Sequence, residues 1–97
     1  MRVIGIKLTN GQEVICRTNA TGDFKQLQET GLEIFDAREI GMQQTAQGIG
    51  LGMGPFLMCN LEAEFFISSR SITTVYEPAG ELEKSYTKQV SKIALLG

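Results

Sequence analysis

The sequence has no histidine and no tryptophan among its 97 residues, and it has only two cysteines. Histidine is the commonest general base near neutral pH and the commonest metal ligand, so its absence excludes Ser-His-Asp and Cys-His catalysis within this chain. Cys16 and Cys59 are too few for a zinc site, which takes about four ligands. Ser68, Ser69 and Ser71 have no visible base beside them and suit a turn. We therefore expect no enzymatic activity, no metal and no cofactor.

Charge of either sign is also scarce. Nine Lys and Arg residues against eleven Asp and Glu residues leave a formal net charge of −2, so any nucleic-acid site must be local. A composition of 42% hydrophobic and 21% charged residues excludes a disordered chain and a multispanning membrane protein. The apolar run at the N-terminus is too short for a signal peptide. We expect a cytoplasmic protein with no membrane partner and with Cys16 and Cys59 as buried free thiols; a single disulfide is the alternative.

The first half of the chain alternates between apolar and other residues, which is typical of strands. Alternation on both sides of Asn10 and Gly11 predicts a hairpin, because these two residues tolerate a positive φ. Residues 19–31 are polar with glycine near both ends, which predicts a loop, or a strand extension broken by a turn. Residues 32–42 have helix propensity, but their period of two leads us to expect a strand.

A long uncharged stretch follows, since residues 41–61 contain no Asp, Glu, Lys or Arg. Within it, residues 48–54 alternate glycine with large apolar residues. The longest run without a polar side chain is twelve residues, too short to span a bilayer, which needs about 20. The glycine spacing does not fit the dinucleotide-binding pattern, because Met53 and Pro55 stand where the last glycine is required. We expect a strand with glycine on one face, where another backbone can approach closely.

The rest of the chain predicts short strands and one helix. Residues 56–59 continue as an apolar strand after Pro55, residues 60–64 form a polar connector, and residues 65–67 begin another strand. Residues 68–71 form a turn, and the β-branched residues 72–76 form a strand that ends before Pro78. Four apolar residues then follow the spacing of one helical face. They are Leu82, Tyr86, Val90 and Ile93.

These elements predict an all-β fold: a small five-stranded antiparallel barrel with a C-terminal α-helix. We expect one domain, with the barrel in residues 1–78 and the helix and tail in residues 79–97. The two latest strands carry no charge to protect their edges, so one subunit offers both a donor and an acceptor edge. Pairing of such edges closes into a ring or grows as a fibre, and we expect a closed homo-oligomer. The interface candidates are Phe56, Leu57, Met58, Ile72, Val75 and Tyr76.

Two segments resemble the motifs of the Sm-like protein family. Residues 8–16 (LTNGQEVIC) are similar to the opening of the first Sm motif, and residues 67–75 (ISSRSITTV) are similar to the second. The whole layout resembles the small Sm-like proteins of marine cyanophages, with common features in residues 48–58 and 86–93. The resemblance implies a strongly bent five-stranded barrel, a homo-oligomeric ring, and single-stranded RNA as a candidate partner around the pore. It also implies that the cytoplasm is that of an infected host cell.

The residue pattern departs from that of RNA-binding Sm proteins. No Asn follows Asp36 at the expected place, and no Gly follows Arg70. For an RNA-binding ring, the candidates are Arg70 and Arg38 for phosphates or base edges, Asp36 for a base edge, and Phe35 for stacking. Each has a structural alternative: an ion pair with Asp36 or a neighbouring Glu for Arg38, a plain turn residue for Arg70, and the core for Phe35.

The alternative function is a protein-interaction or scaffold ring that does not bind RNA. The acidic balance of charge and the missing RNA-binding residues favour it. Its docking surface would be the C-terminal helix or the segment 19–31.

Overall fold

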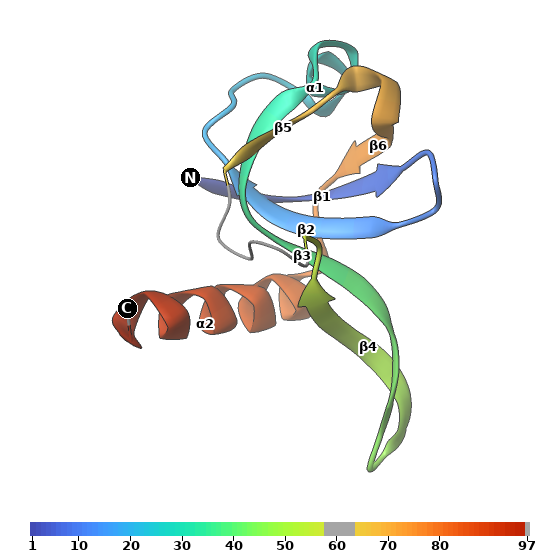
Figure 1. Ribbon diagram of the computed structural model, residues 1–97, viewed down its shortest axis with the longest axis vertical. Helices are drawn as coiled ribbons and strands as arrows, with labels where there is room; N and C mark the ends of the chain where they lie inside the picture. Colours follow the sequence, from blue (N-terminus) through green and yellow to red (C-terminus); the bar gives the residue numbers. More distant parts are fainter. Residues whose placement is uncertain (58–63, 97) are drawn as a thin grey trace.

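Strands are the most abundant regular element of the described residues, and a long helix follows the last strand. The structure is a computed structural model that describes residues 1–57 and 64–96 (Figure 1). The strands are β1 (Arg2–Leu8), β2 (Glu13–Thr18), β3 (Leu32–Thr45), β4 (Gly48–Pro55), β5 (Phe65–Ile67) and β6 (Ile72–Tyr76). The helices are α1 (Phe24–Thr30), the single 3-10 turn η1 (Ser69–Ser71) and α2 (Gly80–Leu96).

The strands form an antiparallel sheet in the order β4-β3-β2-β1-β6, and β5 pairs with β3. The expected sheet-rich fold with a C-terminal helix is confirmed, but six strands are present in the described residues rather than five. The additional strand arises because residues 65–67 pair with the first part of β3 while residues 48–55 pair with its last part.

The predicted hairpin around Asn10 and Gly11 is confirmed. β1 and β2 pair in register from Arg2 opposite Thr18 to Lys7 opposite Glu13. Gly11 has a φ of 94°, which a residue with a side chain rarely adopts. The residues of the turn therefore suit the backbone conformation that joins the two strands.

The prediction of a loop over residues 19–31 is wrong, because Phe24–Thr30 is a helix. Asp23 caps it: its carboxylate accepts a hydrogen bond from the backbone N–H of Gln26, whose side chain accepts one from the N–H of Asp23. This reciprocal capping box is a local signal for a helix start. Gly31, with a φ of 74°, ends the helix. Burial of Leu27 in the core then stabilises a helix too short to persist alone.

Strand β3 is confirmed for residues 32–42 and continues to Thr45. A bulge interrupts its pairing with β2, since Ile15 lies opposite Arg38 whereas Arg17 lies opposite Phe35. The extra residue lies between Phe35 and Arg38, where Asp36 has a φ of 53°. A bulge bends the strand that contains it. β3 therefore belongs to the body of the protein at one end and to a projecting hairpin at the other.

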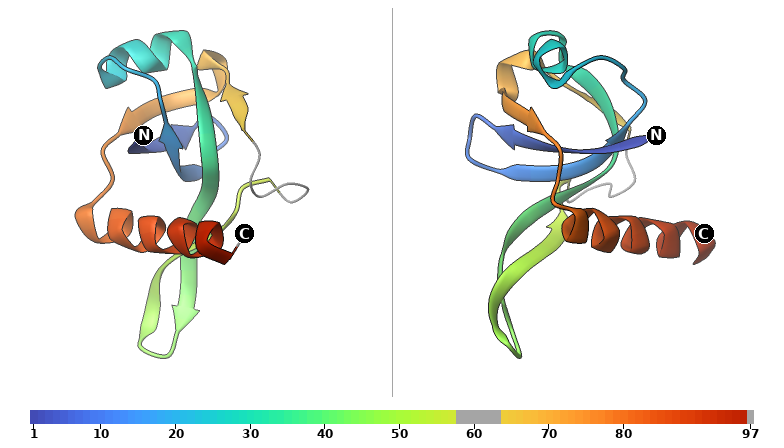
Figure 2. Two further views of the ribbon diagram at one scale, coloured as in Figure 1. Left: turned by 90° about the vertical axis from the view of Figure 1, so that its left-hand side faces the viewer. Right: turned by 180° about the vertical axis from the view of Figure 1, so that it is seen from behind.

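This projecting hairpin, which we call the arm, consists of residues 38–55 and extends away from the body (Figures 1 and 2). The expected strand with alternating glycine is confirmed as β4, but β4 ends at Pro55. The expected continuation through Phe56 and Leu57 is wrong, since these residues form a bend. Proline has no N–H for the ladder, which explains why the strand does not continue regularly there. Met58 and Cys59 lie outside the described residues.

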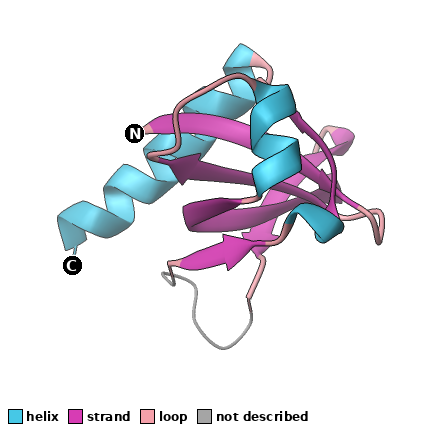
Figure 3. Ribbon diagram, turned by 90° about the horizontal axis from the view of Figure 1, so that it is seen from above, coloured by secondary structure: helices cyan, strands magenta, loops and turns pink. Residues whose placement is uncertain are grey.

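The two faces of the sheet pack against different helices (Figure 3). The larger core contains Val14, Cys16 and Leu27 of α1, whereas the smaller one contains Ile15, Tyr86 and Val90. The predicted C-terminal helix is thus confirmed, with Tyr86 and Val90 on its buried face.

Candidate functional site

The arm exposes large apolar side chains on one face. Met42, Ile49 and Leu51 are 69%, 74% and 62% exposed, and we call these three residues the apolar face of the arm. Met42 lies directly opposite Leu51 across the hairpin, so their side chains share a face. The same face continues toward the body as Ile40 and Met53, which pack against the cluster under α2. The covered core therefore extends into an uncovered apolar surface.

The other face of the arm has few side chains. Gly50, Gly52 and Gly54 of β4 lie on it, and the Gln43 side chain occupies the position that a Cβ at Gly52 would need. A shallow, open depression of about 360 Å³ lies over this part of the hairpin. A face with so little side-chain bulk allows close approach by another backbone.

The sheet ends in open strand edges within the part of the chain that the structure describes. β4 at one end and β6 at the other each have one strand neighbour, and β5 pairs only with β3. Neither β4 nor β6 contains a charged residue. An unpaired, uncharged edge offers N–H and C=O groups to another strand, and charged side chains are one means by which soluble proteins prevent such pairing.

The edge of β6 is partly covered by helix α1. The side-chain oxygen Oε1 of Gln28 accepts hydrogen bonds from the backbone N–H of Val75 at 3.0 Å and from Oγ1 of Thr74 at 3.2 Å. The N–H of Val75 is therefore satisfied by a side chain of the same molecule. Of the two sheet ends, β6 has a partial cover and the distal part of β4 projects from the body.

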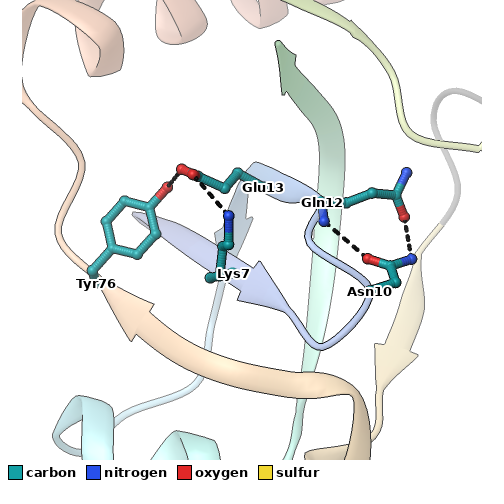
Figure 4. A network of polar contacts seen from close by, with 5 residues as sticks. All are labelled: Lys7, Asn10, Gln12, Glu13 and Tyr76. Carbon is teal, nitrogen blue, oxygen red and sulfur yellow. Dashed lines mark hydrogen bonds and ion pairs between the residues drawn. The ribbon is translucent and has the colours of Figure 1, made fainter.

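A polar network attaches the end of β6 to the first hairpin (Figure 4). The Tyr76 hydroxyl donates to Oε2 of Glu13 at 2.9 Å, and Nζ of Lys7 lies 3.4 Å from Oε1 of the same carboxylate. Partial burial and the neighbouring Glu13 carboxylate raise the pKa of Tyr76 to about 12. Tyr76, an expected interface residue, thus makes its polar contact within the subunit.

The side chains of Ile72 and Val75 point into the core of their own subunit, at 9% and 3% exposure. Because strand side chains point to the faces of the sheet and not to its edge, burial of these two side chains leaves the backbone of β6 and its exposed Thr73 side chain for an interface.

The other interface candidates lie near the base of the arm. Phe56 is half-buried and stacks on Phe65 with 5.7 Å between ring centroids. Leu57 is 37% exposed, and Met58 lies outside the described residues. The sequence pattern did not single out Met42, Ile49 and Leu51 as interface residues, although their alternation with glycine was the available signal.

Asp36 and Arg38, two of the RNA-binding candidates, lie near helix α2. Arg38 is only 5% exposed, and its Nη1 donates to the carbonyl oxygen of Ala37 at 3.0 Å. Asp36 lies 3.9 Å from the guanidinium of Arg17, so its ion-pair partner is Arg17 rather than the expected Arg38. The expectation of a solvated strand around Arg38 is wrong, because this side chain is buried.

The backbone of Asp36 anchors α2. The Tyr86 hydroxyl donates to the Asp36 carbonyl oxygen at 2.8 Å. Burial raises the pKa of Tyr86, the negative charge of Asp36 adds to the increase, and Arg17 and Arg38 oppose it. These charges therefore lie around a buried structural contact.

The remaining RNA-binding candidates lie elsewhere. Phe35 is half-buried, on the strand before the bulge, and Arg70 is exposed on η1, which contacts α1. The backbone N–H of Arg70 donates to Oγ of Ser68, which agrees with the predicted turn. The fold thus separates Arg70, beside α1, from Asp36 and Arg38, beside α2.

Cys16 is a fully buried free thiol, as expected, and burial raises its pKa to about 12. Cys59 lies outside the described residues. In the ranges 1–57 and 64–96, no group of three or more Cys, Asp or Glu residues is placed to hold a metal ion. In the same ranges, no helix is both long and apolar enough to cross a membrane.

Comparison of the chain with protein-family models and with curated proteins finds no match.

Proposed function

We propose that this protein is a non-enzymatic subunit of a homo-oligomeric, Sm-like ring that serves as a scaffold. In this arrangement, the open edge of β5 in one copy pairs with the edge of β6 in the next copy. The observation that carries the proposal is the open sheet, in which β5 and β6 are both uncharged and each has a single strand neighbour in the described residues.

Two different open edges on one subunit favour a ring over an isolated pair. When unlike surfaces join, each copy that is added presents the same free edge again, and the series ends only by closing or by growing as a fibre. The bend of β3 at Asp36 supports a strongly curved, barrel-like subunit of the Sm type. The shape and edge chemistry of the subunit therefore fit the same proposal.

Helix α1 gives this assembly a local competitor. An incoming strand that pairs along all of β6 replaces Gln28 at the N–H of Val75. The exchange substitutes one hydrogen bond for another, and each is worth about 1 kcal/mol net. Ring formation by β6 is therefore compatible with the observed contact but depends on a shift of the Gln28 side chain.

Binding of single-stranded RNA is a second candidate function. The observation in its favour is the exposed Arg70 close in sequence to Phe66, which is 63% exposed, because a cation and an aromatic face together suit an unpaired base. Asp36 and Arg38 lie beside the other helix and give it no support. The scaffold role therefore has the stronger geometric basis.

The test of the scaffold ring is solution mass by light scattering over a wide range of protein concentration. We expect a particle of at least three 10.6 kDa chains, and a single chain at every concentration would overturn the proposal. Thr73→Lys adds a charge to exposed β6 and should reduce the mass, whereas Ser85→Lys on exposed α2 should not.

The RNA arm of the experiment adds labelled U-rich and A-rich oligonucleotides at low salt. Binding that is lost in Arg70→Ala supports the second candidate. Absence of binding at micromolar protein, or binding that Arg70→Ala leaves unchanged, contradicts it.

A further inference from the structure

We infer that the arm is a second self-association surface, in which the outer edge of β4 pairs antiparallel with the same edge of another copy about a two-fold axis near Leu51. This inference goes beyond the proposed ring, which pairs the edge of β5 with the edge of β6 and does not use β4. β6 has five residues, whereas β4 has eight and β5 has three on the other side of the sheet. A β6 strand that pairs with β5 in the ring therefore leaves the longer strand β4 without a second strand neighbour.

The composition of the arm favours a second copy of this chain as its binding partner. Residues 41–55 contain no charged side chain, so the distal arm offers nothing to pair with the phosphates of a nucleic acid or with a charged peptide. It offers instead an open backbone edge and the apolar face formed by Met42, Ile49 and Leu51. The β4 edge of another copy has the same length, the same lack of charge and the same outer side without a strand neighbour.

Side-chain alternation restricts the register of this pairing. Residues directly opposite each other in antiparallel strands point to the same face. Ile49, Leu51 and Met53 share one face of β4, and the glycines share the other, so odd-numbered residues must lie opposite odd-numbered ones. The two-fold axis therefore passes beside a residue and not between two consecutive residues.

Among the positions that satisfy this restriction, an axis at Leu51 pairs the most residues without including Pro55. With Leu51 opposite its own copy, Ile49 lies opposite Met53 and Gly50 lies opposite Gly52 of the second arm. Seven residues pair, from Gly48 opposite Gly54, and Pro55 stays outside the ladder, where its missing N–H costs nothing. An axis at Gly50 pairs only five residues, and an axis at Gly52 brings Pro55 into the pairing.

The pairing also places the apolar faces of the two arms side by side. Leu51 contacts its own copy across the axis, and Met42 lies one strand further out in each arm. The two copies of Met42 are then separated by three strand spacings, about 14 Å, whereas opposed Cβ atoms at the axis lie about 5 Å apart. This difference makes the inference testable by disulfide formation, which needs Cα atoms within about 7 Å.

The experiment compares Leu51→Cys with Met42→Cys, each combined with Cys59→Ser. The two positions are matched, since they lie opposite each other on the same face and are 62% and 69% exposed. Cys16 is kept, because burial makes its thiol unreactive. Under mild oxidation, we expect most of the Leu51→Cys chains to form a disulfide dimer and at most a tenth as much dimer from Met42→Cys.

Equal cross-linking of the two variants, or none in either, overturns the inference. Leu51→Lys, which brings two like charges to the axis, should halve the particle mass in light scattering, and an unchanged mass also contradicts the inference. The experiments distinguish the ring contact from the arm contact. If the protein forms particles of three or more chains but Leu51→Cys forms no disulfide, only the inference about the arm is contradicted. If Leu51→Cys forms a disulfide-linked pair and no particle exceeds two chains, the proposed ring is contradicted.

Discussion

Replacement of Tyr86 by Phe isolates the contact that holds α2 on the sheet. Tyr86 is fully buried, and its hydroxyl donates to the Asp36 carbonyl oxygen at 2.8 Å. Phe keeps the ring and its packing against Ile15 and Val90 but removes the donor. A buried hydrogen bond contributes about 1 kcal/mol net, and a buried carbonyl left without its partner adds to the loss. We expect Tyr86→Phe to lower the free energy of unfolding by about 1–2 kcal/mol.

For a domain of this size, a loss of that magnitude lowers Tm by roughly 4–16 °C. Urea unfolding at one fixed protein concentration measures it, because self-association couples apparent stability to concentration. Tyr76→Phe is the matched control: it removes the same hydroxyl from a half-buried bond to Glu13 and should cost less than 1 kcal/mol. Equal losses in the two variants, or no loss in Tyr86→Phe, would refute the assignment of Tyr86 as the anchor.

Three further predictions concern the bulge, the edge of β6 and pH. Asp36→Ala should be less stable than Asp36→Gly by about 1 kcal/mol in urea unfolding, because glycine adopts the φ of 53° without strain; equal stabilities would contradict this. Gln28→Ala frees the N–H of Val75 and should lower the concentration for half-assembly in light scattering, whereas an unchanged or higher value would contradict competition at β6. The raised pKa values of Tyr76 and Tyr86 mean that the unfolded chain loses protons first as pH rises. Burial raises the pKa of Cys16 as well, so stability should be retained below about pH 9 and fall between about pH 9 and 12, and the fall should be smaller in the two Tyr→Phe variants.

The charged candidate residues show which contacts a sequence pattern can predict and which it cannot. Arg38 and Asp36 are close in sequence and of opposite charge, so an ion pair between them was a reasonable expectation. The bulge changes which residues lie opposite each other, so that Asp36 instead meets Arg17 and the Arg38 side chain is buried. Sequence spacing cannot locate a bulge, because a bulge is defined by how two strands pair across the sheet.

In the arm, the sequence predicted the strand but not the exposure of its side chains. The alternation of glycine with apolar residues predicted the strand Gly48–Pro55 correctly. It did not show which of the apolar residues the body would cover. Met53 packs against the α2 cluster, whereas Leu51 and Ile49 are two and four positions further out and remain exposed. The direction of the hairpin, set by the bent β3, makes this difference.

Local chemistry determined the first hairpin, the strand Ile72–Tyr76 and the C-terminal helix, because turn residues, β-branching and helical spacing act between neighbours along the chain. Helix α1 was also encoded locally, in the capping box of Asp23 and Gln26. The tertiary structure alone decided which edges stay open, which charges are buried and where the arm projects. These properties depend on contacts between residues far apart in sequence, such as Gln28 with Val75 and Tyr86 with Asp36, whose formation requires the whole sheet to be in place.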